Sequence, residues 1–271
     1  MQPRIYQSFF QNFQKSTLDP LFFPLDNTEN KTPLLREYPL LKKCFSKSIE
    51  DNIELWGMFS WKFYKKLNLN SKKIFQMINE NPNKDVYFFN PFYGEVIQYY
   101  NIWEQGEANH KNMIKIIEEI FPLLNLDLNK IYDPMCTDIM FFCCNIVANN
   151  KFWSGFFNIY ENYFDVLNKI NFNIREMHDK SAGYKAAPEL NFFPFIHERF
   201  FSHYININNF NVFSYHHDDK RRSNKNEKNL HYLKKEAILE KNKTKLKKWV
   251  DTRDSMYHLN LSNYFYDKCS W

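Results

Sequence analysis

Two continuous apolar runs constrain the fold more strongly than any other feature of this chain. One occupies residues 86–89, between Asp85 and Asn90, and the other lies within residues 138–148. A short apolar run bounded by turn residues is typical of a strand buried on both faces, as in a parallel sheet covered by helices. We therefore expect the two runs to lie side by side in one sheet, with a nucleotide-sized cleft at the tips near Asn90 and Asn145.

The other segments alternate between strand and helix patterns. Further strands are expected within residues 4–10, 55–63 and 211–215. Helices are expected over residues 34–46, 71–79, 108–121, 151–170, 195–204 and 230–250, with loops at 171–190 and 218–229. Such alternation predicts an α/β architecture with a largely parallel sheet.

The positive charge of the chain is concentrated in one segment. Residues 220–250 hold twelve Lys or Arg and three acids, which gives +9; the whole chain carries +5, so the remainder carries −4. We expect one large domain over residues 1–217 and a basic helical extension over residues 218–271. A basic segment of this kind is either a solvated helix face or a surface for an anionic membrane or nucleic acid.

Composition excludes several common kinds of site. The five cysteines form no C-x-x-C pair, and the five glycines form no phosphate-cradling motif. No apolar stretch reaches the roughly 18 residues of a membrane span, and the amino terminus lacks a signal-peptide pattern, so a cytoplasmic location is expected. Residues 216–219 read His-His-Asp-Asp, but consecutive side chains diverge, and no metal site is expected there.

Two polar segments carry the residues best suited to sugar chemistry. Residues 101–110 gather Trp103, Glu107 and His110 before an apolar helix. Sugar sites combine hydrogen-bonding groups with an aromatic surface, whereas the structural alternative is a helix cap. Glu198 and Arg199 stand between apolar residues, where a charged pair is either a buried structural ion pair or part of an active site.

The ends of the first apolar run offer two candidates. Ligands of open α/β sheets bind outside the carboxyl ends of the strands, which favours Asn90 over Asp85 for contact with a nucleotide donor. Asp85 is either a donor ligand or a turn residue. The sequence contains no D-x-D triplet. Because the carboxylates of such a triplet hold a divalent metal against phosphates, its absence leaves metal dependence open.

Taken in order, these segments resemble the bacterial polysaccharide-biosynthesis glycosyltransferases that carry an N-I-S, E-L-T and Y-I-G-L-x-H-Y-R-R signature. The resemblance covers residues 30–204, most of the chain. The matching positions are Asn30, Leu35-Arg36-Glu37-Tyr38, residues 55–63, residues 85–91, Gln98-Tyr99 with His110, Asn145 followed by Phe152, and Glu198-Arg199-Phe200. The family's H-Y-R-R is Ser60-Trp61-Lys62-Phe63 here, which retains one basic residue.

This resemblance implies a GT-A-like, Rossmann-like domain that transfers a sugar from a nucleotide-sugar donor to a cell-surface polysaccharide or lipopolysaccharide precursor. On this hypothesis Lys62 and Arg199 contact the diphosphate, where negative charge develops. Glu198 is the base for the acceptor hydroxyl, with Glu107 and His110 as alternatives. The remaining candidates are Tyr6, Gln7, Asp85 and Asn90 for the donor, and Trp61, Trp103 and Asn145 for the sugar or the acceptor.

Two other classes of function are alternatives. One is a catalytically inactive glycan-binding or scaffold protein of the same fold, which the missing D-x-D triplet leaves open. The other is a nucleic-acid-binding protein that uses the basic extension, which the acidic body disfavours. The expected partners are a nucleotide sugar and a glycan or lipid-linked acceptor. The basic extension is expected to contact the anionic inner face of the membrane.

Overall fold

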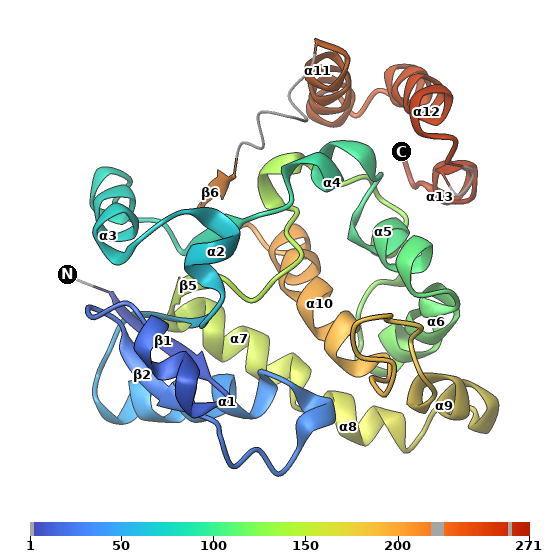
Figure 1. Ribbon diagram of the computed structural model, residues 1–271. Coiled ribbons are helices and arrows are strands. Elements are labelled where there is room, and N and C mark those ends of the chain that lie inside the picture. Colours follow the sequence, from blue (N-terminus) through green and yellow to red (C-terminus); the bar gives the residue numbers. More distant parts are fainter. Residues whose placement is uncertain (1–2, 218–224, 260–261) are drawn as a thin grey trace. The chain divides into compact units, whose positions relative to one another are not determined.

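The computed structural model describes residues 3–217, 225–259 and 262–271, and it divides into two compact units (Figure 1). The sheet unit comprises Met1–Pro91, Cys143–Tyr160 and Asn209–His216, and the helical unit comprises Phe92–Phe142, Glu161–Asn208 and His217–Trp271. The chain changes unit between His216 and His217, next to the expected boundary, and the carboxyl-terminal helices share their unit with residues 92–142 and 161–208.

The sheet unit contains six strands in the order β2-β1-β3-β5-β4-β6. The strands are β1 (Arg4–Phe9), β2 (Phe23–Asp26), β3 (Leu55–Ser60), β4 (Val86–Asn90), β5 (Ile146–Asn149) and β6 (Val212–His216). Neighbouring strands are parallel except at β5, which runs antiparallel to both β3 and β4. The expected α/β class with a mostly parallel sheet flanked by helices is confirmed.

The two apolar runs lie side by side as expected, but the second runs in the opposite direction. Residues 137–139 form a 3-10 turn, and the strand begins only at Ile146. Because β5 is antiparallel to β4, Asn145 precedes its strand and still lies next to the carboxyl end of β4. The backbone N–H of Phe89 donates to the carbonyl of Asn145 at 3.0 Å.

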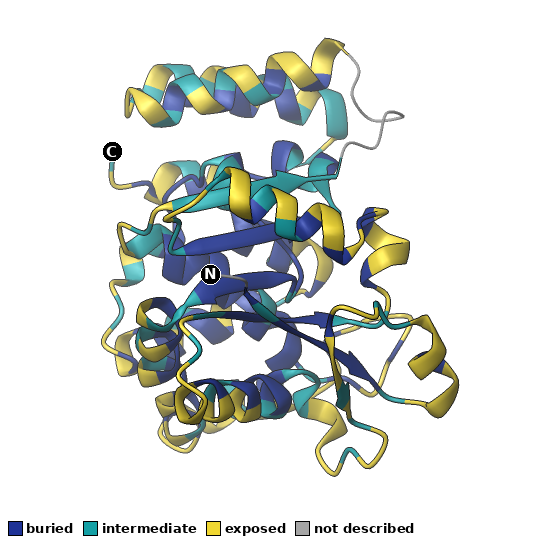
Figure 2. Cartoon of the chain, turned by 90° about the vertical axis from the view of Figure 1, so that its left-hand side faces the viewer, coloured by how far each residue is buried: buried dark blue, intermediate teal, exposed yellow. Residues whose placement is uncertain are grey.

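Helices cover both faces of the sheet through stacked aromatic rings. On one face lie α1 (Tyr38–Glu50) and α7 (Asn150–Tyr160), where Trp153 stacks on Trp56 of β3 with ring centroids 4.4 Å apart. On the other face lie α2 (Phe63–Leu67) and α3 (Ser71–Glu80), where Phe63 stacks on Phe59 at 4.3 Å. The central strands are buried on both faces, as the apolar runs predicted (Figure 2).

The helical unit is built from helices and 3-10 turns in the part that the structure describes. Its longer elements are α4 (Tyr93–Gln98), α5 (Ile102–Asn109), α6 (Met113–Leu123), α8 (Asn162–Leu167), α9 (Phe172–Asp179), α10 (Phe193–Ile207), α11 (Lys225–Leu239), α12 (Lys243–Tyr257) and α13 (Ser262–Lys268). No helix among the described residues is both long enough and apolar enough to span a membrane.

Several expected helices are interrupted, mostly at asparagines. The stretch at 108–121 breaks at Asn112, which has a left-handed φ of 83°, and the stretch at 230–250 breaks where Asn242 caps α12. Asparagine favours such breaks because its side chain competes for backbone hydrogen bonds. The expected loop at 171–190 was wrong over α9, whose first turn is capped by Asn171.

We predict that Gly57→Ala prevents the sheet unit from folding or destabilises it by about 3 kcal/mol or more, at or above the usual range for overpacking. A Cβ at Gly57 would lie 2.1 Å from the carbonyl oxygen of Ile146, and this backbone atom cannot rotate away. Urea denaturation followed by circular dichroism measures the change. Met58→Leu, a volume-conserving change on the same strand, is the control, and equal stabilities of the two variants would refute the prediction.

Candidate functional site

The sheet has a topological switch point between β1 and β3. The chain goes from β1 to β2 on one side, and then crosses to β3 on the other side of β1. Ligands of open α/β sheets bind in the crevice outside the carboxyl ends of the strands at such a point. Here the two strand ends are joined by the N–H of Trp61, which donates to the carbonyl of Ser8 at 2.9 Å.

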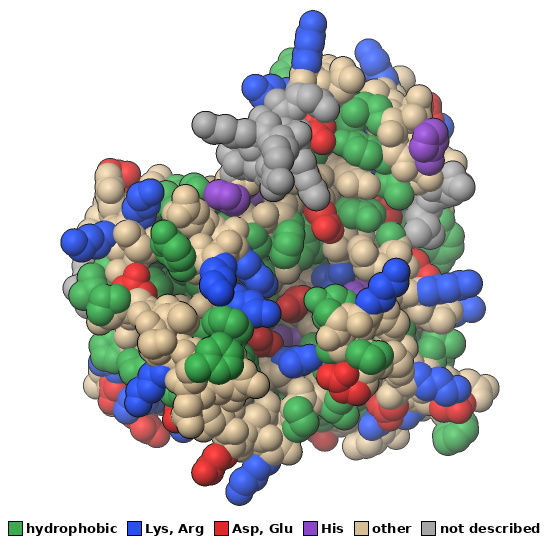
Figure 3. Space-filling model, viewed as in Figure 1, with side chains coloured by type: hydrophobic (Ala, Val, Ile, Leu, Met, Phe, Trp, Pro, Cys, Tyr) green, Lys and Arg blue, Asp and Glu red, His purple; other side chains and the backbone are tan. Residues whose placement is uncertain are grey.

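An aromatic and cationic cluster lies at this switch point. The ammonium groups of Lys62 and Lys65 lie 5.2 and 5.7 Å from the centroid of the Trp61 ring. The ring of Phe13, which is 64% exposed, meets the same indole edge-on at 6.2 Å. Figure 3 shows basic side chains next to hydrophobic ones on the face over α2. We call Phe13, Trp61, Lys62 and Lys65 the switch-point cluster.

Lys62 and Lys65 of the switch-point cluster carry positive charge at the surface. Neither ammonium has an ion-pair partner in the described part of the chain, and both side chains are exposed. Two cations held against one ring repel each other, and an anion between them relieves that repulsion. The cluster is therefore suited to a phosphate or diphosphate next to a flat ring.

Gln7, which was predicted to bind the nucleotide-sugar donor, stabilises this edge of the sheet through hydrogen bonds. Its side chain is buried, with the amide nitrogen donating to the carbonyl of Ser60 at 3.3 Å and the amide oxygen accepting from the N–H of Asp19 at 2.8 Å. Both amide groups are thus used in joining β1, β3 and the following loop. Tyr6, the other predicted donor residue on β1, packs into the aromatic core against Trp56.

A second polar group occupies the same edge, at the end of β4. Asn90 is fully buried, and its amide nitrogen lies 3.1 Å from Nδ1 of His216 at the end of β6. The amide nitrogen of Asn145 lies 3.4 Å from the carbonyl oxygen of Phe89. Two strand spacings separate β3 from β4, so this group lies about 10 Å across the sheet from the switch point.

Asp85 lies at the opposite edge of the sheet from Asn90. One carboxylate oxygen accepts from the side chain of Asn149 and the other from the N–H of Asn211, both at 2.8 Å. The side chain therefore ties the amino end of β4 to the adjoining ends of β5 and β6. These contacts fit the alternative prediction that Asp85 is a turn residue. Asp85 lies away from the carboxyl edge, where a ligand is expected.

In the helical unit, Arg199 is buried and fully engaged. Its guanidinium donates to the carbonyls of Phe195, at 2.7 Å, and Ile102, at 3.2 Å, and to the side chain of Gln105. Burial lowers the pKa of Arg199 to about 10, and the neighbouring Glu198 opposes that shift, so the group stays charged at neutral pH. Glu198 itself is half-buried on α10.

The three predicted residues on and after α5 all make structural contacts. The carboxylate of Glu107 accepts from the N–H groups of Asn112 and Ile114, both at 2.9 Å, and so holds the start of α6. Trp103 is fully buried, and its indole N–H lies 3.3 Å from Nδ1 of His203. Glu107 therefore caps a helix, which was the structural alternative that the sequence left open for this segment.

His110 is held as a neutral imidazole. Its Nδ1 lies 2.9 Å from the carbonyl of Ala182, and its ring stacks on Phe195 at 3.9 Å. Burial, followed by the charge of Arg199, lowers the pKa of His110 to about 4. Because Nδ1 must donate to the carbonyl, Nε2 carries the lone pair, but so low a pKa makes it a weak base at pH 7.

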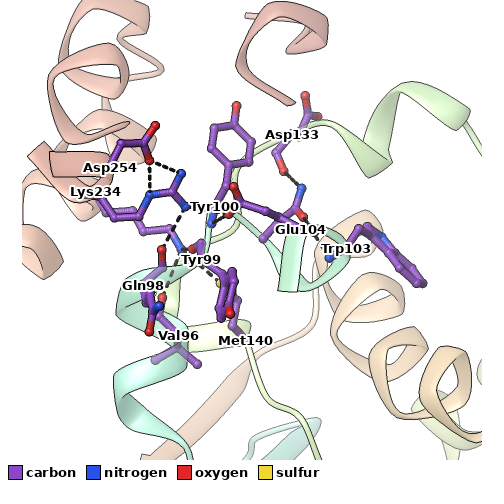
Figure 4. Close-up of polar contacts among 12 residues, drawn as sticks. Val96, Gln98, Tyr99, Tyr100, Trp103, Glu104, Asp133, Met140, Lys234 and Asp254 are labelled. Carbon is purple, nitrogen blue, oxygen red and sulfur yellow. Dashed lines mark hydrogen bonds and ion pairs between the residues drawn. The ribbon is translucent and has the colours of Figure 1, made fainter. Parts of the chain in front are cut away.

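Sequence reasoning missed a buried cationic cluster in the helical unit (Figure 4). The ammonium of Lys234 donates to the carbonyl of Tyr99 at 2.7 Å and to that of Val96 at 3.2 Å. Arg253 donates to the carbonyl of Gln98 at 3.0 Å and to the carboxylate of Glu104 at 2.8 Å. These carbonyls belong to the last turn of α4 and the residue after it, which lack partners within the helix.

The helical spacing of the sequence contained a signal for this cluster. Lys234 lies between Leu230 and Ala237 on the buried stripe of α11, at steps of four and three residues. Arg253 follows Leu246 and Trp249 at similar steps on α12. A cation on the apolar stripe of a helix becomes buried and needs hydrogen-bond acceptors inside the protein. The positions of Lys234 and Arg253 could therefore have predicted this cluster.

No group of three His, Cys, Asp or Glu side chains suited to a metal occurs among the described residues. His216 of the ligand-rich run contacts Asn90 instead, and Asp218 and Asp219 lie outside the described residues.

We predict that Lys234 makes unfolding pH-dependent above neutrality. Burial lowers its pKa from 10.5 to about 7, so between pH 7 and 10.5 the unfolded chain holds a proton that the folded chain does not. Stability therefore rises with pH in that window, by about 1 kcal/mol per pH unit from this group. Below pH 7 its contribution is constant.

The test compares urea denaturation of the native chain and Lys234→Met at pH 7.5, 8.5 and 9.5. The difference in unfolding free energy isolates this lysine from buried thiols such as Cys44, whose burial raises its pKa and which titrates in the opposite sense. The exposed Lys235→Met is the control. A constant difference between the native chain and Lys234→Met across the three pH values would contradict the prediction.

Comparison with known proteins gives one remote structural likeness. No family model and no curated protein matches the chain. Among solved structures, the chain is similar to the apo structure of WbbM, described as a bifunctional glycosyltransferase, with 14% identity and a TM-score of 0.43. The match covers 79% of this chain and 44% of WbbM, so the chain spans less than half of that enzyme.

Proposed function

We propose that this chain binds a nucleotide sugar at the carboxyl edge of its sheet and transfers the sugar to an acceptor hydroxyl. The observation that carries the proposal is the switch-point cluster, in which two exposed ammonium groups flank an indole ring and have no acidic partner among the described residues. A nucleotide sugar has the complementary parts, namely a diphosphate for the cations and flat rings for the aromatic surface.

The proposed reaction is a substitution at the anomeric carbon of the donor sugar. The acceptor oxygen forms a bond to that carbon, the bond from the carbon to the diphosphate oxygen breaks, and the nucleoside diphosphate leaves with the bonding electrons. Lys62, joined by Lys65, stabilises the charge that develops on the leaving group. Trp61 and Phe13 offer ring faces, and Asn90 and Asn145 supply amides at the same edge.

The acceptor proton requires a base, and we assign it to Glu198. The sequence resemblance implies Glu198 for this role, whereas the carboxylate of Glu107 accepts from two backbone N–H groups and His110 has a pKa of about 4. Arg199, which the resemblance also implied for the diphosphate, is buried with its guanidinium donating to protein acceptors, so the diphosphate contact is assigned to the lysines.

The finer parts of the proposal follow from the sequence resemblance. We propose a GT-A-like domain with a polysaccharide or lipopolysaccharide precursor as the acceptor, acting in the cytoplasm. The main alternative is a glycan-binding or scaffold protein that lost catalysis. It is favoured by the structural contacts of Glu107 and Trp103, which leave fewer groups for catalysis.

We predict that Lys62→Met with Lys65→Met weakens the binding of UDP, GDP or their sugar conjugates by about 100-fold, because each charged phosphate contact contributes about 1.4 kcal/mol. Isothermal titration calorimetry on the full chain, after a thermal-shift screen selects the nucleotide, measures the change. The control is Lys72→Met on α3, another exposed lysine of the same unit. Unchanged affinity in the double variant would remove the switch-point cluster from the donor site.

We predict that Glu198→Gln lowers turnover by about 100-fold or more while leaving nucleotide affinity within about twofold, because the base acts on the acceptor and not on the donor. Release of nucleoside diphosphate in the presence of a glycan acceptor panel measures turnover. Glu189→Gln, an exposed carboxylate of the same unit, is the control. Nucleotide binding without turnover in the native chain, across all acceptors, would favour the inactive glycan-binding alternative.

A further inference from the structure

One stripe of α11 is both basic and apolar, and it is exposed along its whole length. The exposed residues recur at steps of three and four, which places them on one helix face: Lys225, Lys228, Tyr232, Lys235 and Leu239. Tyr232 is 58% exposed and Leu239 is 73% exposed. Figure 2 shows exposed and buried residues banded along this helix, which follows the grey segment.

The opposite stripe of α11 fixes which way the exposed face points. Leu230, Lys234 and Ala237 are buried, and the ammonium of Lys234 is anchored on carbonyls at the end of α4. The helix therefore cannot rotate to bury Tyr232 and Leu239 without pulling a cation from its acceptors. The exposed apolar side chains are a consequence of that anchoring.

The acidic neighbours of the stripe are held by contacts with Lys245 and with the hydroxyl of Tyr232. Glu240 binds Lys245 at 2.5 Å, and Glu236 accepts from the hydroxyl of Tyr232 at 2.6 Å and lies 3.8 Å from Lys245. Lys235 makes one loose contact with Asp138, at 3.5 Å. Lys241, just beyond the end of α11, is also exposed and adds a further positive charge.

We infer that this face of α11 docks on an anionic lipid bilayer. The lysines match the negative charge of the headgroups, and Leu239 with the ring of Tyr232 enters the boundary between headgroups and acyl chains. Nucleic acid fits the stripe less well, because an exposed leucine contributes nothing to phosphate or base contacts. Docking through this face of α11 does not depend on whether the sheet unit binds a nucleotide sugar.

The test is cosedimentation of the full chain with vesicles of POPC containing 30 mol % POPG, and with pure POPC, at 50 and 500 mM NaCl. We expect binding to the anionic vesicles at low salt and its loss at high salt. Lys225→Gln with Lys228→Gln and Lys235→Gln weakens partitioning about 100-fold, at about fivefold for each lysine. Tyr232→Ser with Leu239→Ser weakens it about tenfold or more, because apolar insertion is lost.

The matched control keeps the same charge change within the helical unit. Lys111→Gln with Lys115→Gln and Lys185→Gln alters three exposed lysines away from α11, and it leaves partitioning within about threefold of native. Circular dichroism confirms folding of every variant. Three results overturn the inference: no binding to anionic vesicles, equal losses in the stripe and control variants, or a lysine-dependent affinity for a DNA or RNA oligomer without vesicle binding.

Discussion

The sheet depends on one close approach between two backbones. Gly57 of β3 faces Ile146 and Val147 of β5 so tightly that no side chain fits between them. The absence of a side chain at Gly57 lets β5 lie between β3 and β4, to both of which it is antiparallel. It also places the beginning of β5, with Asn145, beside the end of β4. Asn145 and Asn90 lie together at the carboxyl edge of the sheet because Gly57 allows β5 to pair with β3.

The carboxyl-terminal helices have a second structural role, at the end of α4. The last carbonyls of a short helix are unpaired and carry partial negative charge. Lys234 and Arg253 reach these carbonyls from α11 and α12, and both cations lie over the ring of Trp249. A segment that composition marks as a charged extension is therefore also part of a core. The lysines of α11 divide into one buried anchor, Lys234, and the three of the exposed stripe.

Sequence patterns predicted most strands and the longer helices, but they missed β2, α9 and the direction of β5. The apolar runs indicated two buried strands, because burial on both faces removes polar residues from a strand. Strand direction leaves no trace in such a run, so the antiparallel β5 was not predicted. The helix breaks at Asn112 and Asn242 were missed, although asparagine is a recognised break signal.

The candidate site was predicted in part. Asn90 lies at the carboxyl edge of the sheet, where the strand rule put it, and Lys62, which the family resemblance suggested, lies at the same edge. Lys65 and Phe13 were missed because their approach to Trp61 depends on the short turns that follow β1 and β3. Trp103 and Glu107 were predicted as site residues because of their side-chain chemistry. Their structural contacts form only in the folded chain, so the sequence pattern could not show them.

The sheet unit is assembled from three stretches of chain, and this has a consequence during synthesis. Strands β3 and β4 are both made before β5, which belongs between them and follows roughly sixty residues later. At 5–20 residues per second the ribosome needs roughly 3–12 s to deliver that strand. For this interval the nascent protein exposes two unpaired inner strand edges, the kind of surface that chaperones shield and that aggregates recruit.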